Sequence, residues 1–145
     1  MTHLVSQAYI LQDLLHQGQA ALASRSRPDF QHILDVFSHR DMSPPDFDNI
    51  LHAWAFDAIS ADDGESFALI LQARQPSSLL GLSHESLHSL FSVACEHGSL
   101  DILDLMIPDL PYGEMLIMLV QLYEKSSADP VAKSVFDHLL PFKKP

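Results

Sequence analysis

One five-residue segment has the residue types and spacing of a metal-dependent catalyst. His84-Glu85-Ser86-Leu87-His88 matches the pattern H-E-x-x-H. On a helix, histidines four residues apart lie on one face, where both can bind Zn²⁺. The glutamate between them can then act as a general base on metal-bound water. A third ligand would be needed, and the candidates are Glu114, Glu124 and His97. A zinc-dependent hydrolase is therefore one hypothesis for this chain.

The surroundings of this motif favour a different interpretation. Ser83 is a suitable N-cap, which would place His84 in the first helical turn. Zinc-binding histidines usually lie well inside a helix, where other side chains hold their second ring nitrogen. A chain of 145 residues is also short for building a substrate cleft around such a helix. We therefore predict no enzyme activity, no metal site and no cofactor, and keep the hydrolase as the alternative.

The single cysteine gives no sign of nucleophilic chemistry. Cys95 occupies a small-residue position in a helical pattern, which is typical of a buried and unreactive thiol. Cys95 and His97 are two residues apart, so a helix would direct them to different faces. The sequence also lacks a glycine-rich phosphate loop, a serine nucleophile elbow and an EF-hand loop.

The charge is concentrated in the middle of the chain. The net charge is −11, and residues 28–124 hold 16 acidic side chains against only Arg40 and Arg74. Such a segment repels the phosphate backbone of nucleic acids and anionic membrane surfaces. It attracts a basic protein surface, which we predict as the partner. The plain alternative is that the acidic surface only keeps a small domain soluble.

Neither a membrane-spanning segment nor a secretory signal is visible. The longest apolar run, residues 115–120, has six residues, far fewer than the roughly 20 that a spanning helix needs. Residues 1–7 lack a basic region followed by an apolar stretch. We expect a cytoplasmic protein, or one delivered into a host cell without a classical signal peptide. The apolar run itself is expected to be a buried helix, with self-association as the other possibility.

Hydrophobic periodicity predicts helices from end to end and no strand. Gly18 is expected to end the first helix, and Ser43-Pro-Pro-Asp46 to separate two others, because proline is excluded from helix interiors. The fold class is all-α, in a single domain over residues 1–145. The expected helices are residues 4–17, 19–24, 28–37, 46–59, 67–73, 84–97, 100–107, 112–124 and 130–140.

Similar short apolar helices recur along the chain. Residues 33–37, 68–71, 102–107 and 136–140 begin roughly 33 to 35 residues apart, which is a helical-repeat period. A helix pair cannot bury both of its apolar faces alone, so such pairs stack on one another. The prediction is a row of stacked antiparallel helix pairs, with an irregular helical bundle as the alternative.

The segment at residues 89–107 resembles the two helices of an ankyrin repeat. Apolar and small residues from Phe91 to Cys95 match the first helix, Gly98 matches the glycine between helices, and residues 100–106 match the second. The resemblance is best over residues 84–107. A second copy covers 46–73, where Trp54 replaces a small alanine. The β-hairpin finger of the family is not evident, so the array would be a divergent, ankyrin-like α-solenoid.

This resemblance implies a binding module. In ankyrin-like proteins, residues before the first helix of each repeat and at its end line a concave binding face. The implied function is non-catalytic protein binding, as an adaptor, an inhibitor or neutralising protein, or a bacterial effector. The alternative for these polar positions is solvated surface without a partner. The implied contact residues are Asp46, Asp48, Asp57, Glu85, Ser86, His88, Glu96 and His97.

Overall fold

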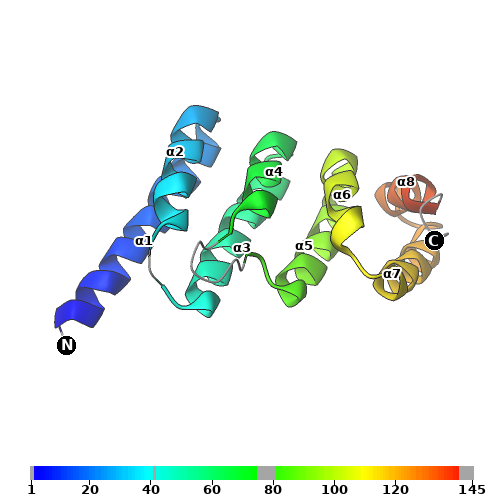
Figure 1. Ribbon diagram of the computed structural model, residues 1–145. Helices are drawn as coiled ribbons and strands as arrows, with labels where there is room; N and C mark the ends of the chain where they lie inside the picture. Colours follow the sequence, from blue (N-terminus) through cyan, green and yellow to red (C-terminus); the bar gives the residue numbers. More distant parts are fainter. Residues whose placement is uncertain (1, 41, 75–80, 141–145) are drawn as a thin grey trace. The chain divides into compact units, whose positions relative to one another are not determined.

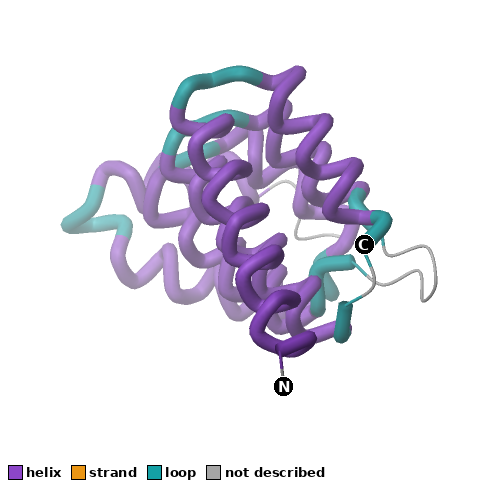
Figure 2. The backbone as a smooth tube through the Cα atoms, turned by 90° about the vertical axis from the view of Figure 1, so that its left-hand side faces the viewer, coloured by secondary structure: helices purple, strands orange, loops and turns teal. Residues whose placement is uncertain are grey.

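The computed structural model describes residues 2–40, 42–74 and 81–140, with side chains over the same ranges except at 2–9 and 112. Within these ranges every regular element is helical and no strand is present (Figures 1 and 2). The predicted all-α class is therefore confirmed. The chain divides into two compact units, Met1–Ser83 and His84–Pro145, where the sequence suggested one domain. Each unit is described by itself.

The helices form four pairs, each joined by a short turn. In every pair the first helix is longer than the second. Their bounds are α1 Thr2–Ala23, α2 Arg27–Ser38, α3 Pro44–Ser60, α4 Gly64–Gln72, α5 His84–His97, α6 Leu100–Met106, the 3-10 turn η1 Ile107–Asp109, α7 Tyr112–Lys125 and α8 Pro130–Leu139.

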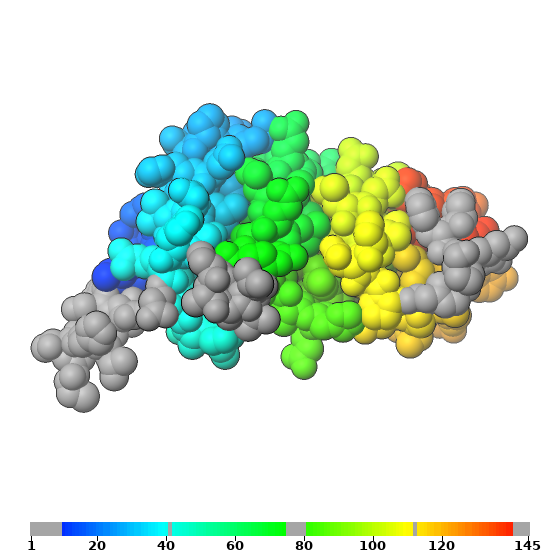
Figure 3. All heavy atoms as spheres, in the orientation of Figure 1, coloured from blue at the N-terminus to red at the C-terminus, as the bar shows by residue number. Residues whose placement is uncertain are grey.

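The first unit consists of two helix pairs packed side by side. α1 packs on α2 and α3, and α4 packs on α3 and α2. The two first helices therefore form one layer and the two second helices the other. Figure 3 shows the atoms of α2 and α4 meeting on one face of this unit. The second unit is arranged differently, because α5 packs on α6 and α8, and α7 packs on α8.

An aromatic cluster fills the centre of the first unit. Trp54 is completely buried, and its ring makes edge contacts with Phe30 and Phe37 at centroid distances of 5.5 and 4.9 Å. Phe37 in turn stacks on Phe47 at 4.8 Å. Aromatic pairs in such geometries add to the stabilisation from burial alone. The indole Nε1 donates a hydrogen bond to the Leu15 carbonyl at 3.0 Å, so its one polar atom is satisfied.

Gly18 does not end the first helix, contrary to the prediction from sequence. α1 continues through it to Ala23. The reason is a close approach, because a Cβ atom at position 18 would lie 2.3 Å from Cε2 and Nε1 of Trp54. Glycine is therefore required here for the indole to pack against the helix backbone. The absence of a side chain at position 18 makes room for the large side chain at position 54.

The two prolines before α3 also lie inside the helix rather than before it. Pro44 and Pro45 form the first turn of α3, and the Ser43 side chain caps it by accepting a hydrogen bond from the Asp46 N–H at 3.3 Å. Proline is tolerated there because the first N–H groups of a helix have no intrahelical partner.

Three of the four turns between paired helices share one hydrogen-bonding pattern. Each contains a residue with positive φ, namely Arg25 (62°), Asp62 (53°) or Gly98 (69°). The N–H of the next residue donates to an alanine carbonyl five positions back, at 2.8 to 3.1 Å. This arrangement is the Schellman motif that ends many helices. The three bonds are Ser26 to Ala21, Asp63 to Ala58 and Ser99 to Ala94.

The shared hydrogen-bonding pattern continues into the second helix of each of these pairs. The residue after the positive-φ position is the N-cap of the second helix, and its carbonyl accepts from the residue four positions on. Those residues are Phe30, Phe67 and Leu103, and all three are fully buried. The turn between α7 and α8 departs from the pattern, since the Asp129 N–H donates to the Lys125 carbonyl. The repeat is therefore regular over three pairs.

Candidate functional site

The H-E-x-x-H segment lies on the first two turns of α5 and meets a glutamate from α7. His84 Nε2 lies 3.4 Å from Glu114 Oε1, and His88 Nδ1 lies 3.6 Å from Glu114 Oε2. The two histidines are one helical turn apart, so both face the same carboxylate. Glu114 is one of the three partners that the sequence offered for the histidines.

The other two candidates are not part of this group. His97 is in the last turn of α5, and its Nδ1 lies 3.0 Å from the Val93 carbonyl oxygen. Glu124 is exposed near the end of α7, whereas Glu114 is in the first turn of that helix. The sequence could not choose among them, because the choice depends on how α7 meets α5.

The arrangement is that of a carboxylate bridging two imidazole rings. The side chains of His84 and His88 are about half exposed, at 56% and 51%, and Glu114 is 30% exposed. Glu114 Oε2 is nevertheless buried and has no hydrogen-bond partner. Each ring can form an ion pair with Glu114 when it is protonated. Among the described residues, no group of three or more His, Cys, Asp or Glu side chains could hold a metal ion.

The predicted contact residues differ widely in exposure. Five are exposed, Asp48 and Asp57 are half-buried, and Ser86 is only 8% exposed. Ser86 therefore contributes to the interior of the second unit, and we leave it out of the contact surface. Three of the eight lie in the first unit and five in the second. The exposed five are Asp46, Glu85, His88, Glu96 and His97.

Asp48 already has a partner within its own unit. Its Oδ1 accepts a hydrogen bond from the Ser83 N–H at 2.7 Å, and its Oδ2 accepts from the Ser83 hydroxyl at 3.0 Å. A carboxylate that accepts from both groups fixes the chain just before α5 begins. We therefore assign Asp48 to stabilising this segment rather than to contacting a partner.

Asp57 is the predicted contact residue with an unusual environment. It lies in the last turn of α3, and its Oδ2 is buried without a hydrogen-bond partner. Buried polar atoms are nearly always paired, so this oxygen needs an explanation.

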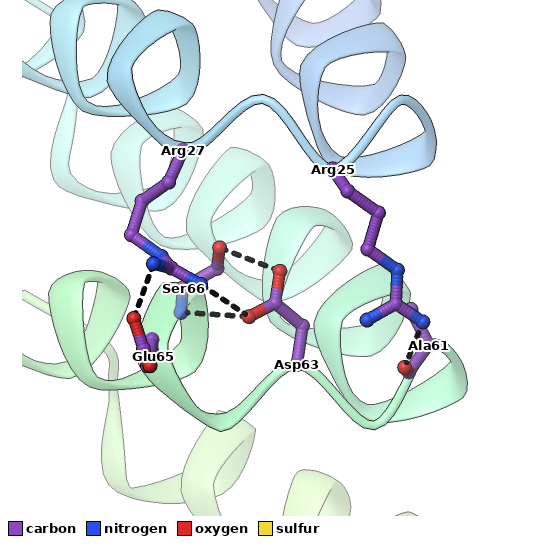
Figure 4. Close-up of polar contacts among 6 residues, drawn as sticks. All are labelled: Arg25, Arg27, Ala61, Asp63, Glu65 and Ser66. Atoms are coloured by element: carbon purple, nitrogen blue, oxygen red, sulfur yellow. Dashed lines mark hydrogen bonds and ion pairs between the residues drawn. The ribbon is translucent and has the colours of Figure 1, made fainter.

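Charged side chains that the sequence did not single out connect the turn between α1 and α2 to the turn between α3 and α4 (Figure 4). Arg25 Nη2 donates to the Ala61 carbonyl at 2.8 Å. Arg27 forms an ion pair with Glu65 and lies 4.0 Å from Asp63. Asp63 is buried and caps α4, because it accepts from the Ser66 N–H at 3.2 Å and the Ser66 hydroxyl at 2.7 Å. These contacts give Arg25 and Arg27, two of the few basic residues, a structural role.

Cys95 is buried as expected, which argues against a nucleophilic role. Burial and, to a smaller extent, the nearby Glu96 raise the pKa of its thiol to about 12, against the opposing effect of Lys125. A thiol with this pKa is protonated at neutral pH, and the thiolate is the reactive form.

The apolar run at residues 115–120 forms an amphipathic part of α7 rather than a fully buried helix. Met115, Met118 and Leu119 are buried, while Ile117 and Val120 are more than half exposed. No helix in the described parts of the chain has the length and apolar character needed to cross a membrane. Comparison with known proteins gives no match, whether with family models, curated proteins or solved structures.

Proposed function

We propose that this chain is a non-catalytic binding module that recognises a basic protein surface. The observation that carries the proposal is the acidic surface on a helical-repeat scaffold. Residues 28–124 have a net charge of −14, and the exposed residues Asp46, Glu85 and Glu96 lie on the first helices of successive pairs. Complementary charge speeds encounter with a basic partner and disfavours acidic ones.

The repeated turns support an ankyrin-like character for this scaffold. Three successive helix pairs use the same Schellman turn, cap position and buried residue in the second helix. Within the first unit, the packing of α1 on α3 holds the two first helices in a preformed arrangement. A preformed surface loses little conformational freedom on binding. Adaptor, inhibitor or neutralising protein, and bacterial effector are the roles that suit such a surface.

The test is a matched pair of charge-reversal variants. The full chain captures a partner at about 50 mM salt, and the dissociation constant is then measured for each variant and at rising salt. We expect Asp46→Lys combined with Glu85→Lys to weaken binding at least about tenfold. The control, Asp35→Lys combined with Asp109→Lys, changes the net charge equally at exposed positions elsewhere. Equal weakening by the two variants, or binding that does not depend on salt, would contradict the proposal.

The alternative proposal is a zinc-dependent hydrolase that uses His84, Glu85 and His88. The observation in its favour is that Glu114 faces both histidines. Its difficulty is that this group, as described, is not arranged to hold a metal ion. The test is the zinc content of protein purified without a metal-chelating tag. One zinc per chain that is lost in the His84→Ala variant would favour the hydrolase over the binding module.

A further inference from the structure

A hollow lies on the first unit between the C-terminal ends of α1 and α3. Its volume is about 430 Å³, which is large enough for a side chain of a partner. Leu22, Ala23 and Ala61 contribute apolar groups to its lining, while Gln19 and Ser60 contribute polar groups. Asp57 completes the lining, and its buried Oδ2 has no hydrogen-bond partner.

The carboxylate of Asp57 gives the hollow an acceptor for a hydrogen-bond donor. Leaving a buried carboxylate oxygen unpaired is unfavourable for the folded chain. Within the described residues Asp57 forms no ion pair, and the nearby Arg25 donates to the Ala61 carbonyl instead. The chain therefore maintains an unfavourable group beside an open hollow.

The helix ends around the hollow favour a positively charged ligand. α1 ends at Ala23 and α3 at Ser60, so two helix C-termini meet at the hollow. Turn hydrogen bonds pair the Ala21 and Ala58 carbonyls at these ends, and the helix dipole still places a partial negative charge there. This partial charge acts in the same direction as the Asp57 carboxylate.

We propose that this hollow receives a lysine or arginine side chain of the basic partner. The methylene groups of that side chain would lie against Leu22, Ala23 and Ala61, and its charged end would donate to the accessible side of the Asp57 carboxylate. Long basic side chains combine these two properties, an apolar stem and a charged tip. The proposal rests on the proposed function, because it names the contact by which the basic partner is held.

The experiment is an NMR titration of the full ¹⁵N-labelled chain with a capped Gly-Lys-Gly-Lys-Gly peptide. The comparison peptide has norleucine in place of each lysine. We expect the lysine peptide to shift the amide signals of residues 22–23 and 57–61, and the norleucine peptide to leave them unchanged. Asp57→Asn should weaken binding about tenfold, since it removes one charge-assisted hydrogen bond.

The control variant is Asp62→Asn, which removes the same charge five residues away. Asp62 is exposed and has a positive φ, a conformation that asparagine also tolerates. We expect this variant to bind the peptide within about twofold of the original chain. Equal weakening by both variants would mean that only the general acidic field attracts the peptide, and the site would be refuted.

Thermal unfolding of the same variants gives a second readout. Because Asp57 Oδ2 is unpaired in the free chain, Asp57→Asn should leave the melting temperature unchanged or raise it. A clear fall would show that another group of the chain pairs with Asp57, and would overturn the proposal. Shifts confined to other acidic residues would refute this site while the proposed function stands. No binding of the basic peptide at any site would count against both.

Discussion

Individual acidic residues in this chain have different roles, and the role of each depends on where it lies in the structure. Asp63 is buried and caps α4, Asp48 holds the segment before α5, and Asp46 is exposed. Asp57 differs from these three, because it is partly buried and has an unpaired oxygen. A substitution at each of these positions therefore tests a different property, namely stability for the first two and binding for the last two.

At the residue scale, Gly18→Ala should destabilise the first unit. The added Cβ would lie 2.3 Å from the Trp54 ring, which is fully buried and enclosed by Phe30 and Phe37. The ring cannot move aside easily, so we expect a loss of about 1–3 kcal/mol in the free energy of unfolding. Chemical denaturation followed by Trp54 fluorescence measures this directly, because Trp54 is the chain's single tryptophan.

The matched control is the same substitution at Gly113. This glycine lies in the first turn of α7, and an added Cβ would have no neighbour within 4 Å. Alanine is the better helix former by up to about 1 kcal/mol, so Gly113→Ala should be neutral or stabilising. Similar effects of the two substitutions would contradict the explanation given for Gly18.

At the scale of the elements, the repeated turn shows that one backbone geometry can be built from three residue types. Arginine, aspartate and glycine occupy its positive-φ position in successive pairs. Glycine adopts this conformation without strain, whereas other residues lose roughly 1–2 kcal/mol. The turn persists because the Schellman hydrogen bonds and the buried alanine hold it on both sides.

The turn predicts opposite outcomes for two substitutions at equivalent positions. Gly98→Ala should lower the free energy of unfolding by about 1–2 kcal/mol, because φ is +69° and the new Cβ would lie 3.0 Å from Val131 Cγ1. Asp62→Gly should raise the free energy of unfolding, or leave it within about 0.5 kcal/mol of the original value, because glycine relieves the same strain. Urea denaturation followed by circular dichroism measures both. A stabilising Gly98→Ala would show that the turn is not fixed in this conformation.

At the scale of the whole molecule, the aromatic core belongs entirely to the first unit. Phe30, Phe37, Phe47 and Trp54 all come from residues 1–83 and are linked by three ring contacts. We expect a fragment of residues 1–83 to unfold cooperatively on heating, with Trp54 emission typical of a buried indole. A gradual transition, or emission typical of a solvated indole, would mean that this core is insufficient alone.

Most of the helical architecture could be predicted from the sequence. Apolar residues at helical spacing and the turn at Gly98 depend on neighbouring residues, so the helices and many of their ends follow from local chemistry. The extent of α1 could not be predicted in this way, because Gly18 is explained by Trp54, 36 positions later. The shared turn was not recognised from the sequence because three different residue types occupy its positive-φ position. The signal that could have shown it is the alanine at positions 21, 58 and 94.

The sequence by itself determined the acidic charge, the all-α class and the H-E-x-x-H spacing on one helix face, because each depends on composition or on residues within a few turns. The tertiary structure alone decided that Glu114 faces His84 and His88, that Asp48 is held by Ser83 and that Ser86 is buried. It also left Asp57 Oδ2 unpaired beside a hollow. These features depend on which helices pack together, and packing brings together residues that are far apart in the chain.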